Sequence, residues 1–347
     1  MGKVTIKDVA KKANVSVTTV SNVLNNSGRT SPDTIRKVRQ VIQELEFSPS
    51  ASARNLRDKK SHLIAVVVPF LEKGRLQDNP FYWQLVLGIE EGARNHQLHV
   101  ILLGVDDEES FSFVKERHLD GLIVVGTYEE SPIFKKILSL DVPCVFMDSY
   151  LSDPNLYQIY LDDEMGGYLG TKHLISLGHR RIALLTGKIQ KDGVNYKRWL
   201  GYRRALEEAD LPYDAELIRE EPVSTVGGYQ AAQYITDSRR NISAVFVFSD
   251  VGAMGLIKGL QELGVQVPRD ISVVGFDDLF YTDFMIPSLT TVKQNIAERG
   301  HITVQLLLEQ ISEESRSDSR KVVLPVSLKV RQSTAPVSHP NHENRVK

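Results

Sequence analysis

Residues 4–24 read VTIKDVAKKANVSVTTVSNVL, and they predict two short helices joined by a tight turn. Thr5 and Asp8 have the spacing of a capping pair at the start of a helix. Asn14 tolerates the left-handed backbone that a tight turn needs, and Ser16 can cap a second helix that begins at Val17. Apolar residues recur at helical spacing in both segments. The stretch therefore has the pattern of a helix-turn-helix unit.

The outer face of the second helix is short and neutral, consisting of Val17, Thr18, Ser21 and Asn22. A solvated helix usually carries Lys and Glu on such a face. Side chains of this size let a helix enter the major groove of DNA, where Ser, Thr and Asn can bond base edges and Val can contact a thymine methyl group. This face favours DNA reading, although helix pairs without a DNA function can share the pattern.

Charge is unevenly distributed along the chain. Residues 1–60 contain 12 Lys or Arg and 5 Asp or Glu, a balance of +7, whereas the remainder contains 30 and 39, a balance of −9. A basic leading segment on an acidic body suggests that the leading segment binds a polyanion. A lysine-rich solvated face is the competing interpretation.

A third helix is expected after Pro32, followed by a segment that is unstable alone. Pro49 ends the preceding structure, and residues 50–57 could form a helix too short to persist without a partner.

The rest of the chain alternates strand-like and helix-like segments. The expected strands are 63–68, 100–103, 121–125, 142–147, 182–185, 244–248 and 271–275, and the expected helices are 82–95, 133–140, 165–176, 197–208, 228–238, 252–263 and 296–309. This alternation predicts doubly wound α/β sheets. This number of strand–helix units is too large for one hydrophobic core, so we expect two lobes. The first lobe would consist of about 62–161 and 292–322, and the second of about 162–291 and 323–337. A ligand is expected in the cleft between them, at the carboxyl ends of the strands.

The chain resembles the lactose-repressor (LacI/GalR) family in several places. The segments that carry the resemblance are 4–10, 15–21 and 48–56, then LDD at 161–163, LGHRRI at 177–182, ISVVGFDD at 271–278 and PSLTTV at 287–292. The resemblance implies an all-α helix-turn-helix DNA-binding domain at 1–48 and a hinge helix and linker at 49–60. It further implies a two-lobed α/β effector-binding and dimerisation domain at 61–337, of the periplasmic-binding-protein-like (type I) fold. Residues 338–347 are expected to be a disordered tail.

The resemblance also implies DNA contacts. Val17, Thr18 and Asn22 would read bases, and Leu56 would wedge into the minor groove of a kinked duplex. The remaining implied DNA contacts are Thr5, Ser16, Thr19, Ser21, Asn25, Asn55 and Arg57. Asn14 replaces a common glycine, and Asn22 stands where many members carry arginine, which leaves the base preference at that position open.

The implied effector contacts are Phe81, Tyr82, Arg198, Asp250 and Asp277. Carboxylates, an arginine and aromatic faces suit a sugar or sugar acid rather than a purine. Two departures leave the ligand open, because Ser249 replaces a common asparagine and Val223 lies where some relatives place an aromatic residue. Without the resemblance these five residues would equally fit core, turn and ion-pair positions.

These observations predict a cytoplasmic, homodimeric regulator, expected to repress a carbohydrate operon, that binds a pseudo-palindromic operator in double-stranded DNA and is controlled by a small-molecule effector. The sequence contains no run of about 20 apolar residues, so no membrane span is predicted. The single Cys144 excludes an internal disulfide. Neither a cofactor nor a metal site is expected, since the nine His show no metal spacing. The alternatives are a solute-binding receptor with the same body fold, against which the lack of a signal peptide counts, and an enzyme, for which no nucleophile–base set is visible.

Overall fold

The computed structural model describes residues 4–24, 27–28, 30–47, 60–69, 79–106, 108–312 and 320–337. The chain divides into two compact units, residues 1–61 and 62–347. Except for Lys60, the predicted hinge at 49–60 lies outside the described residues, as does the predicted tail at 338–347.

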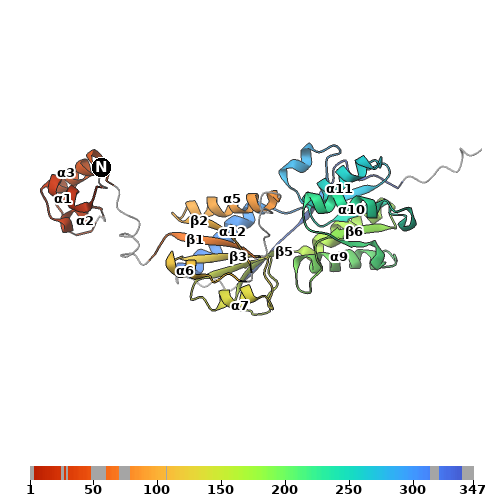
Figure 1. Cartoon of the computed structure of the whole chain (residues 1–347), viewed down its shortest axis with the longest axis horizontal. Coiled ribbons are helices and arrows are strands. Elements are labelled where there is room, and N and C mark those ends of the chain that lie inside the picture. The colour runs from red at the N-terminus through yellow and green to blue at the C-terminus, as the bar shows by residue number, and fades with distance from the viewer. Residues whose placement is uncertain are drawn as a thin grey trace, which may run out of the picture. The chain divides into compact units, whose positions relative to one another are not determined.

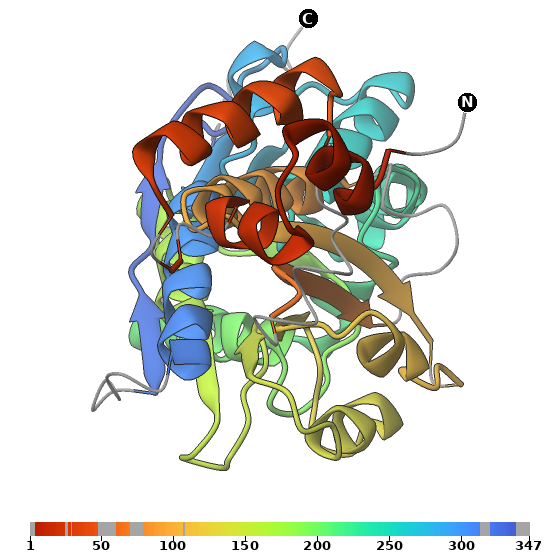
Figure 2. The ribbon, with the colours of Figure 1, turned by 90° about the vertical axis from the view of Figure 1, so that its left-hand side faces the viewer.

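The first unit contains three described helices, α1 (Ile6–Ala13), α2 (Val17–Leu24) and α3 (Pro32–Glu44), red and orange in Figures 1 and 2. Thr5 donates its backbone N–H and its hydroxyl to the Asp8 carboxylate, at 2.8 and 2.7 Å. Asn14 ends α1 in the left-handed conformation, with φ 52°. Val9, Val20 and Val38, one from each helix, are fully buried, and burial of each stabilises the unit by about 1.5–3 kcal/mol.

Lobe 1 of the second unit is built on a parallel sheet with strand order β11-β5-β4-β3-β1-β2. Its strands are β1 (Leu63–Pro69), β2 (His99–Val105), β3 (Gly121–Val125), β4 (Cys144–Met147), β5 (Tyr157–Leu161) and β11 (Lys321–Leu324). Its helices are α5 (Pro80–Arg94), α6 (Ser112–Glu116), α7 (Pro132–Leu138) and α12 (Ile296–Ser312).

Lobe 2 repeats this arrangement, with strand order β12-β10-β9-β8-β6-β7 and one antiparallel pair, β10 with β12. Its strands are β6 (Ile182–Thr186), β7 (Ile218–Glu220), β8 (Ala244–Val247), β9 (Ser272–Asp277), β10 (Thr290–Lys293) and β12 (Ser327–Lys329). Its helices are α8 (Asp163–Ser176), α9 (Val194–Glu208), α10 (Thr225–Ile235) and α11 (Asp250–Glu262), with short 3-10 turns η1 (Ala215–Leu217), η2 (Ser238–Arg240) and η3 (Phe280–Phe284).

Each sheet is covered by helices on both faces, which explains the continuous apolar strands. Along β1, Ile64 and Val66 pack in the cluster that contains α5 and α12, whereas Ala65 and Val67 pack in the cluster that contains α6 and α7. The strands of lobe 2 alternate in the same way between α10 with α11 and α8 with α9. In Figure 1, α10 and α11 lie on one side of β6 and α9 lies on the other. Strands buried on both faces need no polar alternation.

The chain passes between the two lobes three times. It enters lobe 2 after β5, returns to lobe 1 between β10 and α12, and leaves again between β11 and β12. The crossings predicted near 161 and 292 lie close to those observed. The third was predicted near 322, but β11 extends lobe 1 to Leu324 because it pairs with β5 from Lys321 onward.

The expected strands and helices are all present, with ends that differ by a few residues. The strands β5, β7, β10, β11 and β12 and the short helix α6 were not predicted. β5 contains the polar Gln158, which is fully buried because its side-chain amide bonds the backbone of Leu151. β7 has only three residues and lies at a sheet edge. Among the described helices, none is long and apolar enough to cross a membrane.

Candidate DNA-reading helix and effector site

The predicted DNA-reading residues lie on the side of α2 that faces away from the core. Val17 and Thr18 are exposed, and Ser21 and Asn22 are half-buried. On the opposite side, Val20 is buried. The structure therefore offers the four predicted side chains together on one helix face, with no charged residue among them.

The start of α2 is fixed by its own hydroxyl groups. The Ser16 Oγ accepts the backbone N–H of Thr19 at 3.0 Å, and the two side-chain hydroxyls bond each other at 2.8 Å. At its end, Asn22 lies against Gly28, where an added Cβ would approach the Asn22 amide nitrogen to 2.9 Å. Two further predicted DNA contacts have hydroxyls that already make a hydrogen bond. The hydroxyl of Thr5, which caps α1, bonds Asp8, and the hydroxyl of the half-buried Thr19 bonds Ser16. The predicted contacts Asn25, Asn55, Leu56 and Arg57 lie outside the described residues.

A polar cluster lies between the two lobes, at the carboxyl ends of their strands. We call it the interlobe cluster. It contains two of the predicted effector residues and four that the sequence analysis did not select, and its members are Asp148, Asp163, Arg198, Asp277, Gln294 and Arg299.

Arg198, on α9, is held by partners from both sides of its guanidinium group. Its Nε donates to Asp163 at 2.8 Å, and its Nη1 donates to the Phe248 carbonyl oxygen at 2.8 Å. The guanidinium carbon lies 3.5 Å from the centre of the Phe276 ring. Because a guanidinium has five N–H donors, this arrangement fixes its plane and leaves further donors for a ligand.

Asp277 ends β9 in a left-handed conformation, with φ 121°. Its carboxylate is almost fully buried and accepts a hydrogen bond from the Gln294 Nε2 at 2.6 Å. Burial raises the pKa of Asp277 to about 7, against the opposing charge of Arg198. Backbone strain of this kind is typical of functional sites.

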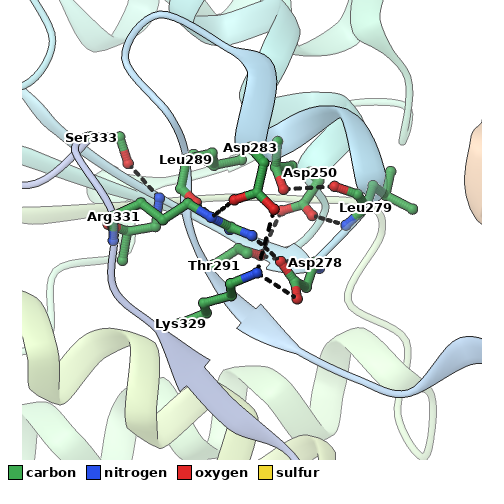
Figure 3. A network of polar contacts seen from close by, with 11 residues as sticks. Asp250, Asp278, Leu279, Asp283, Leu289, Thr291, Lys329, Arg331 and Ser333 are labelled. Carbon is green, nitrogen blue, oxygen red and sulfur yellow. Dashed lines mark hydrogen bonds and ion pairs between the residues drawn. The ribbon is translucent and has the colours of Figure 1, made fainter.

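The predicted effector contact Asp250 is engaged by bonds within lobe 2. Asp250 is fully buried, with one carboxylate oxygen accepting the Thr291 hydroxyl at 2.6 Å and the other accepting the Leu279 N–H at 2.8 Å (Figure 3). Burial raises the pKa of Asp250 well above its usual range. Asp250 therefore anchors the turn after β9, and its contact with an effector stays a prediction, because a carboxylate after a strand can serve either purpose.

The predicted aromatic residues Phe81 and Tyr82 begin α5. Their rings meet edge to face, with centroids 5.4 Å apart, and both pack against the core of lobe 1. Burial raises the pKa of the Tyr82 hydroxyl to about 12, and the charges of Asp148 and Asp277 contribute. Asp148 and Asp277 both belong to the interlobe cluster.

The residues that sequence reasoning missed come from lobe 1, from the second crossing and, in Asp163, from the start of α8 in lobe 2. Arg299 is fully buried on α12, where it pairs with Asp148 and donates to the Gln294 Oε1 at 2.9 Å. Tyr150 donates its hydroxyl to Asp163 at 2.6 Å. Asp148 directly follows β4, as Asp277 ends β9, and this strand-end position was the available signal for it.

Two buried hydroxyls at the strand ends have no partner. The Oγ1 atoms of Thr127 and Thr186, which lie at the ends of β3 and β6, make no hydrogen bond among the described residues. Since buried polar groups are normally satisfied, these hydroxyls are available to a ligand on the same side of the sheets.

The segment that carries Asp277 is tied down by the C-terminal strand (Figure 3). Arg331 pairs with Asp278 and Asp283 and donates to the Leu289 carbonyl oxygen at 2.7 Å. Lys329 adds a charge contact to Asp283 at 3.4 Å. The turn between β9 and β10 is thereby fixed in place from outside the cleft.

The described residues contain no cluster of potential metal ligands. Cys144 is half-buried at the start of β4, and burial raises the pKa of its thiol to about 12, which makes it a poor nucleophile.

Comparison with known proteins identifies the family. Residues 5–50 match the model of bacterial regulatory proteins of the lacI family, and residues 171–334 match a periplasmic binding protein-like domain. The HTH-type transcriptional regulator DegA of Bacillus subtilis is 35% identical, over 97% of this chain and 99% of its own. The chain belongs to the lacI family. It is a DNA-binding transcriptional regulator.

Two solved structures of this lacI-family fold support the assignment. A lac repressor dimer bound to operator and the anti-inducer ONPF is 30% identical, covers 96% of this chain and 100% of its own, and has a TM-score of 0.84. The complex of the transcriptional regulator CelR with cellobiose is 28% identical, covers 95% of this chain and 100% of its own, and has a TM-score of 0.72.

Proposed function

We propose that this lacI-family regulator reads its operator with the outer face of α2 and releases or retains it according to a sugar bound at the interlobe cluster. The observation that carries the proposal is the joint presence of a neutral, exposed helix face on a basic unit and a buried carboxylate–arginine cluster between two lobes.

The α2 face supports base reading because its side chains are short and uncharged. Thr18 and Asn22 offer donors and acceptors to base edges, and Val17 offers a methyl contact. The phosphate-neutralising charge comes from the surrounding basic residues of the unit.

The interlobe cluster supports a polyhydroxylated ligand. Asp277 and Arg198 present an acceptor and a donor to adjacent hydroxyls, and the orphaned hydroxyls of Thr127 and Thr186 add further contacts. The cellobiose complex of CelR supports the same ligand class, and a carbohydrate operon is the proposed target of repression.

Exposed apolar residues support a dimer. Trp83 and Leu87 on α5 are 68% and 56% exposed, and in and beside η3 Phe284 and Ile286 are 72% and 88% exposed. Large apolar side chains of this exposure mark protein interfaces. Two copies related by a two-fold axis would present two α2 helices to a pseudo-palindrome, and Phe284→Glu should give a monomer in analytical ultracentrifugation.

The test is selection of genomic fragments by the purified full chain at physiological salt, followed by binding assays on the selected site. We expect Thr18→Ala with Asn22→Ala to remove the preference for that site, while Gln43→Ala, at an exposed position on α3, leaves it intact. A full chain that shows no preference among fragments would contradict the assignment of α2.

The effector part is tested on the same fragment with a panel of sugars and purines. We expect a sugar to change operator affinity and Asp277→Asn to abolish that change. A response to a purine and to no sugar would overturn the ligand class and leave the DNA function standing.

A further inference from the structure

A cavity of about 300 Å³ lies beside the interlobe cluster and is bounded by both lobes. Lobe 1 contributes Tyr128, Tyr150 and Tyr160, and lobe 2 contributes Lys191 and Lys197. We call it the lateral cavity. Its volume is at the lower end of the range for small-molecule sites, and none of its lining residues was among the predicted effector contacts.

The wall from lobe 1 is rigidly built. Gln158 holds the turn at Leu151 by accepting its N–H at 3.0 Å and donating to its carbonyl oxygen at 3.2 Å. The carboxylate of Glu129 accepts the Ser152 N–H at 2.5 Å, and the Lys321 ammonium donates to the Leu151 carbonyl oxygen at 3.3 Å. The turn is thus held from three separate elements, as a preorganised binding wall requires.

Three functional groups that line the cavity are available to a ligand. Among the described residues, the ammonium groups of Lys191 and Lys197 and the hydroxyl of Tyr160 make no hydrogen bond or ion pair. The Lys197 Nζ lies 5.3 Å from the centre of the Tyr150 ring, and the Tyr150 and Tyr160 rings are 4.7 Å apart. Together they form an aromatic wall with free donors at its edge.

The lateral cavity is linked to the interlobe cluster through Tyr150. Tyr150 lines the cavity with its ring and donates its hydroxyl to Asp163, which holds Arg198. Lys197 directly precedes Arg198 on α9. One side chain, Asp163, therefore separates the Tyr150 hydroxyl from Arg198, and a ligand bound at Arg198 could extend past Tyr150 into the cavity.

The charges of the lining favour a neutral, hydroxylated group. Against Lys191 and Lys197 stand Glu129, Glu130 and Asp192, a balance of 2 − 3 = −1, which disfavours a phosphate or carboxylate. A sugar hydroxyl both donates and accepts, so it matches a lining that offers ammonium donors and carboxylate acceptors, while the aromatic wall suits the apolar face of a pyranose ring.

We propose that the lateral cavity is a subsite for a second sugar ring, so that the effector of this protein is a disaccharide or a longer glycoside rather than a monosaccharide. This inference rests on the proposed effector site. Because the second ring would touch lobe 1 and lobe 2 together, it would stabilise this spacing of the lobes over others, as a ligand must do to shift a conformational equilibrium.

The test is calorimetric titration of the full chain with glucose and galactose and with maltose, cellobiose and lactose. We expect one disaccharide to bind at least tenfold more tightly than either monosaccharide. Lys197→Ala and Tyr160→Ala should each weaken that disaccharide about tenfold and leave monosaccharide binding unchanged. Lys115→Ala, an exposed lysine on α6, is the matched control and should change neither.

Tyr160→Phe separates the ring from the hydroxyl, since it keeps the stacking face; we expect it to retain most of the affinity that Tyr160→Ala loses. If Tyr160→Ala fails to fold, the subsite is still tested by Tyr160→Phe and by Lys197→Ala, which changes a half-buried residue. A monosaccharide that binds as tightly as the disaccharides, disaccharide binding that is insensitive to Lys197→Ala, or no binding by any of the three disaccharides would each overturn the subsite. Operator binding and its loss in Thr18→Ala are measured separately, so these outcomes leave the regulatory function untouched.

Discussion

The α2 face and the interlobe cluster are built in opposite ways. The four α2 residues lie within six positions of one helix, remain at least partly accessible and bear no charge. The cluster draws its residues from α8, α9, β9, α12, the position after β4 and the segment between β10 and α12. Its charged groups are nearly all buried against one another. The α2 face can therefore change without cost to the fold, whereas the cluster supports both the ligand and the body.

The largest effect is expected for Asp163→Ala, which leaves the buried Arg198 without its carboxylate. Loss of one partner of a buried pair costs about 3–5 kcal/mol, so the free energy of unfolding of the body should fall by this amount in urea titrations. Glu164→Ala is the matched control, because that neighbouring carboxylate pairs with Arg204 at the surface and should cost less than about 1 kcal/mol. Equal effects would show that the cluster does not support the body.

The pH dependence of stability should sharpen the same contrast. The folded protein holds the Asp277 proton more tightly than the unfolded chain, because burial raises the pKa of Asp277 from 3.8 to about 7. The contribution of Asp277 to the free energy of unfolding is therefore present at acid pH and is lost as the pH rises from about 4 to 7. The loss amounts to up to about 4 kcal/mol. Unfolding of wild type and Asp277→Asn at pH 4.5 and pH 8 should show the variant gaining relative to wild type at the higher pH. A constant difference would contradict a buried, titrating Asp277.

On the α2 face, Thr18→Ala should change DNA binding alone. Loss of one base contact costs about 1–3 kcal/mol of discrimination, with unfolding unchanged. Because no phosphate contact is removed, the slope of log affinity against log salt concentration should stay as in wild type. A reduced slope would reassign Thr18 to the DNA backbone.

The smallest effect is expected for Ser16→Ala, which removes the cap of α2. We expect a loss of about 1 kcal/mol, confined to the first unit and seen as faster amide exchange in α2. Ser27→Ala, at an exposed serine beyond the end of α2, should leave that exchange unchanged. Faster exchange in the body as well would mean that the two units unfold together.

The same contrast explains how much the sequence could predict. The α2 face follows from local periodicity and capping, so its residues could be chosen from the single stretch 4–24. At the cluster, Arg198 and Asp277 were found by resemblance. Arg299 could not be found from the pattern, because a buried arginine interrupts the apolar stripe of α12 and finds its partner Asp148 151 positions away. The internal bonds of Asp250 could not be found from the pattern for a related reason, because its partners, Thr291 and Leu279, are supplied by another strand and turn.

The three passages of the chain between the lobes have a consequence for engineering. Because the chain passes between the lobes three times, a single cut in one passage leaves two covalent links between them. New termini placed between β11 and β12 should therefore be tolerated far better than the same cut inside a sheet. Such permutants, with a fluorescent protein inserted at the opened passage, would report lobe movement directly.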